Sequence, residues 1–436
     1  MTTFRDRKTT TPSPEKLPLG KIAELFAGGQ LPLRFTAYDG SSAGPPDAPI
    51  GMHLANPRAT NYLATAPGDL GMARAYVAGD MEVDGVHPGD PYVALKLMAD
   101  ELHLRRPSMS ELAQVTRSLG WERLRPVPPP PQESRPRWRR VVDGLAHSRH
   151  RSADAVHHHY DVSNRFYELV LGPSMTYTCA VFDNENVHLD QAQERKHQLI
   201  GDKLALQPGM RLLDIGCGWG GMVMHAARRG VRALGVTLSE QQVRWAQQAI
   251  EREGLGHLAE VRHLDYRDAP GRDYDVISSI GLTEHVGVHE YHSYFSQLLD
   301  KLRPGGLLLN HCITRPDNKG SSRPDAFIDR YVFPDGELAG SGRIIAEAQN
   351  AGLEVRHEEN LREHYALTLK GWCANLVANW DECVAEVGIG TARVWGLYMA
   401  ASRLSFERNG IQLHQVLAVR PDVTGNAHVP LRPWWH

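Results

Sequence analysis

The sequence predicts an α/β fold in its larger, C-terminal part, with a doubly wound and mostly parallel sheet, preceded by a smaller α+β domain. Short apolar runs typical of buried parallel strands occur at 211–216, 231–237, 259–265, 274–281 and 306–314. Helical stretches separate them, for example SEQQVRWAQQAIEREG at 239–254. A chain of 436 residues is also too long for one ordinary core. These observations together favour two domains.

The N-terminal part has its own pattern of elements. Residues 1–16 are polar and charged and predict a disordered tail, and the first domain is expected over 17–125. Within it, 31–40 alternates and ends in an Asp-Gly turn, so it predicts a strand. Residues 68–85 predict a short helix followed by a glycine turn, and 91–106 predict an amphipathic helix.

A proline-rich basic linker is predicted at 126–150, because a proline run removes backbone donors and favours extended chain. It leads into a basic segment over 135–151 that contains Trp138. This segment is either a solvated linker face or a contact with an anionic lipid surface. The second domain is expected over 151–436.

Composition limits the functions to consider. The formal charge is only −3, which gives no indication of a nucleic-acid partner. Five scattered cysteines with no CxxC pair argue against a disulfide framework and for a reducing compartment. No apolar run of about 18 residues occurs, so we expect a cytoplasmic protein whose membrane contact is peripheral, at the inner face of the plasma membrane. The run His157-His158-His159 is not expected to bind a metal, because consecutive side chains point in different directions.

The stretch LLDIGCGWGG at 212–221 follows a predicted strand and opens a helix. Its glycines let the backbone turn tightly and approach a ligand. A glycine pattern alone would also suit a nicotinamide enzyme. The acid two residues before the first glycine instead favours S-adenosylmethionine (SAM), whose cationic methionine end it can help to hold. The candidate residues are Asp214, Gly216, Gly218 and Gly220.

Polar residues follow the next two strands. The second strand ends at Thr237, and Gln242 lies on the following helix, so a hydroxyl and an amide stand where an acid often binds ribose. After the third strand, Asp265 is placed to accept from the adenine amino group and Tyr266 to flank the ring. Each residue taken alone is an ordinary polar group at a strand end.

These stretches resemble the cyclopropane-fatty-acyl-phospholipid synthase family, an actinobacterial-type member of it, over about 156–419. The resemblance rests on HHYDVSNRFYELVLGPSMTYTCAVF (158–182), DIGCGWGG, GVTLSEQQ, LDYRD, SIGLTEHVG (279–287), LLLNHCI (307–313), DRYVFPDGEL (329–338) and ERNGIQLHQVL (407–417). Residues 68–85 also resemble the N-terminal domain of the phospholipid-acting members. The resemblance implies a SAM-dependent methyltransferase domain of Rossmann-like fold and an accessory, lipid-binding first domain.

The reaction implied is addition of a methylene across a cis double bond of a phospholipid acyl chain. A base, bound bicarbonate in this family, removes a proton from the new methyl group so that the ring closes. The resemblance assigns the anion site to Cys179, Glu284, His311, Ile313 and Tyr365. Backbone amides at Cys179 and Ile313 are expected to donate to the anion, and Glu284 to accept from its O–H. The same resemblance assigns SAM contacts to Tyr177, Thr178, Leu238 and Arg267, besides residues already named.

Several readings stay open from the sequence. The carbocation could end as a methylene or methyl branch, as in tuberculostearic-type synthesis, instead of a ring. A non-catalytic lipid- or SAM-binding module and a methyltransferase of water-soluble substrates are further alternatives. Cys179 alone is more often a small buried apolar residue than a site residue. Residues 389–409 are expected to wall the acyl channel, where Trp395, Tyr398 and Met399 suit plain core equally well. Homodimerisation is expected from the resemblance only.

Overall fold

The structure is a computed structural model of the chain, and it describes residues 16–134, 163–319, 325–333 and 336–435. Residues 1–15 of the predicted tail, the whole basic segment 135–151 and His157-His158-His159 lie outside the described residues. Two compact units are present, one within 1–87 and 93–130 and the other within 88–92 and 131–436. They are described separately below.

The first unit contains a small mixed sheet in the order β2-β1-β3-β4. β1 (Arg34–Ala37) is parallel to β3 (Gly51–Leu54), whereas β2 (Ser42–Ala43) and β4 (Met81–Asp84) pair antiparallel. The helices of this segment are α1 (Leu19–Phe26), α2 (Pro57–Thr65), α3 (Asp69–Val77), α4 (Tyr92–Glu101), α5 (Met109–Leu119) and η1 (Trp121–Leu124). The predicted strand at 31–40 and the helix within 68–85 are present, but 81–84 forms a strand where only a turn was expected.

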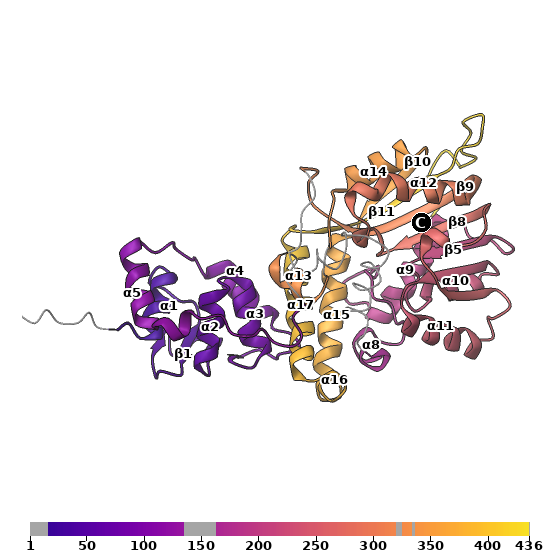
Figure 1. Cartoon of the computed structure of the whole chain (residues 1–436). Helices are drawn as coiled ribbons and strands as arrows, with labels where there is room; N and C mark the ends of the chain where they lie inside the picture. Colours follow the sequence, from indigo (N-terminus) through magenta and orange to yellow (C-terminus); the bar gives the residue numbers. More distant parts are fainter. Residues whose placement is uncertain (1–15, 135–162, 320–324, 334–335, 436) are drawn as a thin grey trace, which may run out of the picture. The chain divides into compact units, whose positions relative to one another are not determined.

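The second unit is built on a seven-stranded sheet in the order β10-β11-β9-β8-β5-β6-β7. Strands β5, β8, β9, β10 and β11 are labelled in Figure 1. All pairs among β9, β8, β5, β6 and β7 are parallel, whereas β11 pairs antiparallel with β9 and β10. The strands are β5 (Arg211–Ile215), β6 (Arg232–Thr237), β7 (Ala259–His263), β8 (Tyr274–Ile280), β9 (Leu302–Thr314), β10 (Glu354–Asn360) and β11 (Gln412–Val419). This confirms the predicted α/β class and its five parallel strands.

Helices cover both faces of this sheet. Among the residues that the structure describes, the α-helices of this unit are α8 (Asn164–Leu171), α9 (Leu189–Lys203), α10 (Gly221–Arg228), α11 (Glu240–Arg252), α12 (Tyr291–Lys301), α13 (Ala326–Tyr331), α14 (Ser341–Asn350), α15 (Arg362–Ala378), α16 (Trp380–Val387) and α17 (Ile389–Glu407). The same residues contain short 3-10 turns that follow strands or precede helices: η3 (Tyr266–Asp268), η4 (Thr283–His285) and η5 (Val288–Glu290).

Two apolar cores result from the alternation of side chains along the strands. One core joins the sheet to α9, α10 and α11 through residues such as Leu212 and Leu417. The other joins it to α12 and α14 through residues such as Leu213 and Val416. Neighbouring strand residues therefore point into opposite cores. β5 connects to β6 on one side of it, whereas its other neighbour, β8, connects to β9 on the opposite side. The turn after β5 therefore stands at the topological switch point, where open α/β sheets bind ligands.

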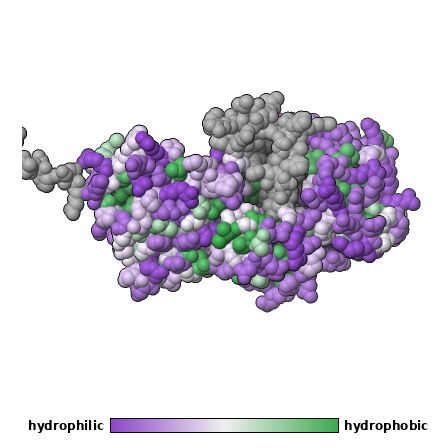
Figure 2. All heavy atoms as spheres, turned by 60° about the horizontal axis from the view of Figure 1, so that its bottom comes forward, coloured by the Kyte–Doolittle hydropathy of each residue, from purple (hydrophilic) through white to green (hydrophobic). Residues whose placement is uncertain are grey.

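The hydropathy of the helices and of the exposed side chains bears on whether the described chain could contact or cross a membrane. In the part of the chain that the structure describes, no helix is long and apolar enough to span a bilayer. Hydrophilic side chains cover most of the described surface on the face shown in Figure 2. Large exposed apolar side chains do occur in the first unit, where Leu104, Met109 and Trp121 are 71, 82 and 71% exposed.

Candidate active site

A cavity of about 520 Å³ opens where the parallel strands end, a volume typical of cofactor and ligand sites. Its lining comes from many parts of the chain, among them the segment before α9, α9 itself, the turn after β5, the ends of β6 to β8, strands β9 and β11, and helices α15 and α17. Among the predicted site residues, the lining includes Tyr177, Thr178, Asp214, Gly216, Gly218, Thr237, Leu238, Gln242, Asp265, Tyr266, Arg267, Glu284, His311, Ile313 and Tyr365. The fold thus brings fifteen dispersed predictions to one place.

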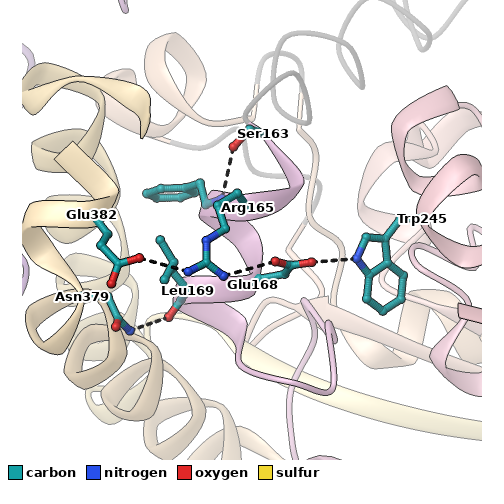
Figure 3. A network of polar contacts seen from close by, with 8 residues as sticks. Ser163, Arg165, Glu168, Leu169, Trp245, Asn379 and Glu382 are labelled. Atoms are coloured by element: carbon teal, nitrogen blue, oxygen red, sulfur yellow. Dashed lines mark hydrogen bonds and ion pairs between the residues drawn. The ribbon is translucent and has the colours of Figure 1, made fainter. Parts of the chain in front are cut away.

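Helix α8 precedes the cavity-lining segment 175–178, and Figure 3 shows the polar contacts that hold this helix. Ser163 caps it by accepting from the Phe166 amide. On one side Arg165 pairs with Glu382, and on the other Glu168 accepts from the Trp245 indole of α11 at 3.1 Å. Helix α8 is thus tied to α16 and α11, and the chain that follows it lines the cavity at 175–178.

Tyr177 lies in an aromatic group behind the cavity. Its ring is 5.3 Å from that of Trp372 and 5.6 Å from that of Trp395, and its hydroxyl is 3.2 Å from the Tyr398 hydroxyl. Trp395 and Met399 of α17 are buried core, whereas Tyr398 lines the cavity. Helix α17 therefore serves as both core and cavity wall.

The glycine turn after β5 has the backbone shape that only glycine adopts easily. Gly216 and Gly218 have φ of 69° and 54°. A Cβ at Gly218 would meet nothing within 4 Å, and the residue lines the cavity, so a side chain there would occupy ligand space. Gly220 supports the turn from outside the lining, since a Cβ there would contact Ala246 at 3.3 Å.

Asp214 is a buried carboxylate at the floor of the cavity, 2% exposed, and accepts from the Ser278 hydroxyl at 2.7 Å. Burial raises its pKa to about 7. Lys196 of α9 also lines the cavity and is fully buried, and its ammonium donates to the Thr178 hydroxyl at 2.9 Å. Burial lowers the pKa of Lys196 to about 7, and nearby Asp214 opposes this shift.

The residues after β6 and β7 make contacts among themselves. The Thr237 hydroxyl donates to the side-chain oxygen of Gln242 at 2.7 Å, and Ser239 caps α11 by accepting from the backbone amide of Gln242. Asp265 accepts two hydrogen bonds from the Arg267 guanidinium, at 2.8 and 2.5 Å. Both carboxylate oxygens of Asp265, which was expected to accept from the adenine amino group, therefore accept from Arg267. The Asp265–adenine contact remains a prediction.

The predicted anion site contains two unsatisfied polar atoms. Glu284 stands in η4, and its Oε1 accepts from the Ile313 amide at 2.7 Å, while Oε2 is buried without a hydrogen-bond partner among the described residues. His311 Nε2 is likewise buried and unpartnered in the described chain. Burial raises the pKa of Glu284 to about 7 and lowers that of His311 well below its usual value. The Ile313 amide, expected to donate to an anion, here donates to Glu284 instead.

Cys179 has a different environment from the rest of the set. It is fully buried but does not line the cavity, and its thiol donates to the carbonyls of Ala180 and Leu361 at 3.2 and 3.7 Å. Burial raises the pKa of the thiol, which keeps it protonated. The Cys179 side chain is therefore part of the packed interior, and only the backbone amide of Cys179 is left as a candidate contact with the anion.

Three buried polar side chains at or near the cavity were not predicted from the sequence, and all come from α9: Lys196, His197 and Lys203. Lys196 and His197 line the cavity, and Lys203 is fully buried beneath the sheet. The available signal was periodicity, because Lys196 and Lys203 lie on the same helical stripe as buried Ala192 and Leu199. A charged residue on an apolar stripe indicates a buried partner.

The cavity fits SAM. A buried carboxylate, a threonine hydroxyl held by a lysine and a glycine turn with open space around Gly218 match a ligand with a cationic, amino-acid end. In the described residues, no cluster of three or more metal-ligating side chains occurs. The fold and this site together define a SAM-dependent methyltransferase.

Comparison with known proteins specifies the family. Residues 147–416 match the mycolic acid cyclopropane synthetase family. A probable fatty acid methyltransferase of Mycobacterium tuberculosis is 62% identical over 96% of this chain and 99% of its own length. The tuberculostearic acid methyltransferase of the same organism is 32% identical over 94% of this chain and 95% of its own length.

A solved structure supports the same assignment. A mycolic acid cyclopropane synthase in complex with S-adenosylhomocysteine (SAH) and CTAB superposes with a TM-score of 0.57, at 32% identity, over 61% of this chain and 97% of that one. The chain belongs to the mycolic acid cyclopropane synthetase family, which confirms the resemblance seen in its sequence.

Proposed function

We propose that the protein uses SAM to add a methylene across a cis double bond in an acyl chain of a membrane phospholipid, which forms a cyclopropane ring. The observation that carries this proposal is the pair of buried atoms Glu284 Oε2 and His311 Nε2, which have no hydrogen-bond partner among the described residues and belong to residues that line the same cavity as the cofactor residues. A simple methyl transfer to an oxygen or nitrogen acceptor does not need a carboxylate and an imidazole that together bind a small anion. Membership of a family named for ring formation supports the same reaction.

SAM, when bound, supplies the electrophilic methyl group. An isolated alkene is a poor nucleophile, so the residues around it must align it in a dry site. Leu369, Phe406 and Leu413 give the cavity apolar walls. The rings of Tyr365 and Tyr398 also line it, and aromatic faces stabilise the positive charge that develops on the alkene carbon.

Bicarbonate, when bound, supplies the oxygen base that accepts a proton from the new methyl group. The residues present fit it, because a carboxylate oxygen and an imidazole nitrogen are both buried without partners in the described chain. An ion with both an O–H and anionic oxygens complements such a pair. Glu284 keeps the base oriented by accepting from its O–H, a role that requires the ionised carboxylate.

A second outcome is favoured by one comparison. The tuberculostearic acid methyltransferase matches this chain over nearly its full length, first unit included. In that outcome the methylated chain loses its proton elsewhere and keeps a branch instead of closing a ring. The early steps and the residues that hold the cofactor are the same.

Product analysis decides between the two. The purified protein is incubated with SAM and vesicles of oleoyl phospholipid, and the lipids are examined by mass spectrometry and proton NMR. Cyclopropyl protons together with a gain of one CH₂ are expected. A branched methylene signal without cyclopropyl protons would establish the second outcome, and turnover of a water-soluble acceptor without vesicles would contradict both.

Removal of the anion tests the base. Activity measured in buffer freed of carbon dioxide should fall at least about tenfold. This is less than the rate enhancement of about 10²- to 10⁴-fold that a positioned base typically contributes. Added bicarbonate should restore it, whereas added chloride should not. Full activity without bicarbonate would show that a protein group takes the proton.

A further inference from the structure

A buried chain of polar side chains leads from the protein surface to His311. Glu359 pairs with Lys203, the Lys203 ammonium lies 2.7 Å from Gln415 Oε1, and Gln415 Nε2 lies 3.2 Å from His311 Nδ1. Lys203, Gln415 and His311 are each at most 1% exposed. A polar chain this deep in a core is expensive to bury, which indicates a specific role.

The sheet itself sets the spacing of this chain. Gln415 of β11 lies directly opposite His311 of β9 and opposite Glu359 of β10 in the strand registers. The three residues therefore form a row across three neighbouring strands. Lys203, the last residue of α9, lies against this row and bridges Glu359 to Gln415.

The donors and acceptors in this row can be assigned one after another. A lysine ammonium only donates, so the Gln415 atom that it contacts must be the amide oxygen. The other end of the amide is then the NH₂ group, which also only donates. His311 Nδ1 must accept from it, and a ring nitrogen that accepts carries no proton. A neutral imidazole then bears its proton on Nε2.

We infer that the Glu359–Lys203–Gln415 row fixes His311 in the tautomer whose Nε2–H points into the cavity as a hydrogen-bond donor. Gln415 and Lys203 are positioning residues, since they act through His311 and do not line the cavity. The row determines the chemistry that the unpartnered Nε2 offers to a ligand.

The surroundings of His311 keep the ring neutral. Burial and the nearby cations Lys196 and Lys203 all lower its pKa. Burial also lowers the pKa of Lys203, but the Glu359 carboxylate opposes that shift and holds the ammonium proton. The ring is thus neither a base nor an imidazolium.

A consequence for the ligand follows, and this step rests on the proposed function. The ligand must present an acceptor to His311 and a donor to the ionised Glu284. A small oxyanion that keeps one O–H, as bicarbonate does, meets both requirements. A fully deprotonated anion or a neutral apolar group does not.

The spectrum of the unmodified protein tests the tautomer directly. Histidine labelled with ¹⁵N in the ring reports which nitrogen carries the proton, and the His311→Gln variant identifies the His311 signals. We expect a protonated Nε2 and an unprotonated Nδ1. A proton on Nδ1, alone or together with one on Nε2, would overturn the inference, and this measurement needs no other substitution.

Gln415→Glu is the matched perturbation. A carboxylate of the same shape still accepts from Lys203 but can only accept from His311, so the ring proton should move to Nδ1. We expect kcat to fall about 10- to 100-fold, the effect typical when an orienting partner of a site histidine is lost, with SAM affinity unchanged within twofold. Nδ1 remaining unprotonated in this variant would contradict the role of Gln415.

Gln412→Glu is the control, because Gln412 is on the same strand but bonds to Asn409 and does not line the cavity. It should keep wild-type kcat. The tautomer is measured without SAM or lipid, so its result is separate from the product analysis. If His311 carries its proton on Nε2 but the lipid product is branched, only the proposed cyclopropane formation is disproved. If the product is a cyclopropane but His311 carries its proton on Nδ1, only the inference about the tautomer is disproved.

Discussion

At the scale of single residues, Glu284 has the most informative environment. One of its oxygens is fixed by the Ile313 amide and the other is buried and unpartnered in the described chain. Burial raises its pKa to about 7, which means that a carboxylate normally ionised at pH 5 is half protonated at neutral pH. Glu284 therefore changes between its protonated and ionised forms near neutral pH, and only the ionised form can accept a hydrogen bond from the O–H of a ligand.

The first prediction concerns Glu284→Gln. The variant should bind SAM as the wild type does, because Glu284 serves the base and not the cofactor, but lose at least about 100-fold in kcat. In the wild type, kcat/KM for lipid should rise with pH through about 7 as the carboxylate ionises. Asp214 and Lys196 also have pKa values of about 7, so the limb that belongs to Glu284 is identified by comparison with the Glu284→Gln profile, with SAM saturating in both.

The variant should lack this rising limb. Isothermal titration with SAH and a pH–rate series measure the two effects separately. Lost cofactor affinity in Glu284→Gln, or an unchanged pH profile, would refute the assignment.

Cys179 gives the second prediction. Its thiol bonds to two carbonyls and lies outside the cavity, and a serine hydroxyl can donate to the same oxygens. Cys179→Ser should therefore lower kcat by less than about tenfold, well below the 10²- to 10⁴-fold effect of losing a positioned base. Steady-state rates of both variants on one lipid preparation make the comparison. An inactive serine variant would show that the thiol itself takes part.

At the scale of elements, the turn after β5 gives the third prediction. Gly218 and Gly254 both have positive φ, 54° and 68°, and neither would bring a Cβ within 4 Å of another atom. Alanine at either position should cost roughly 1–2 kcal/mol of stability from the backbone alone. Only Gly218 lines the cavity, so only Gly218→Ala should weaken SAM binding, by tenfold or more.

Thermal unfolding and cofactor titration of the two variants test this pairing. Gly254→Ala is the control for strain, since Gly254 follows α11 on the surface. Equal SAM affinity in the two variants would mean that the ligand does not approach the turn at Gly218.

Helix α9 shows how one element supports two parts of a site. Lys196 holds the Thr178 hydroxyl on the cofactor side, and two turns later Lys203 anchors Gln415 behind His311. Both lysines lie on the stripe that packs against the sheet. A change in the position of this helix would therefore disturb both the cofactor residues and the anion residues.

At the scale of the whole molecule, membrane association is the fourth prediction. The substrate we propose lies in a bilayer, yet the formal charge of the chain is −3, so attraction must be local. The basic segment 135–151 supplies local positive charge, and the first unit supplies the exposed side chains of Leu104, Met109 and Trp121. Each cation near an anionic leaflet contributes about 1 kcal/mol.

Vesicle sedimentation measures this association. Binding should increase with the content of anionic phospholipid. It should weaken as salt is raised from about 50 to about 500 mM, because the Debye screening length is roughly 10 Å at 0.1 M salt and shortens further as salt increases. Neutralising the arginines of 135–151 should remove most of the salt dependence. Binding that responds to neither salt nor lipid charge would refute the electrostatic part of this prediction.

The sequence by itself determined the fold class and most of the cavity. Short apolar strands, a glycine turn after one of them and polar residues at the ends of the next are local patterns, and parallel strands necessarily bring their carboxyl ends to one edge. That geometry brings Asp214 and Thr237 to one edge of the sheet, whereas Glu284 was assigned to the site by the family resemblance; all three line the cavity.

Tertiary structure decided what local patterns cannot contain. The direction of the Ile313 amide toward Glu284, the withdrawal of Cys179 from the cavity and the row from Glu359 to His311 all depend on strand register and helix placement. Partners in that row are separated by 104 to 212 positions along the chain, so their hydrogen bonds leave no periodic trace. The physical reason is that a donor's partner is chosen by distance in space, which only the folded sheet defines.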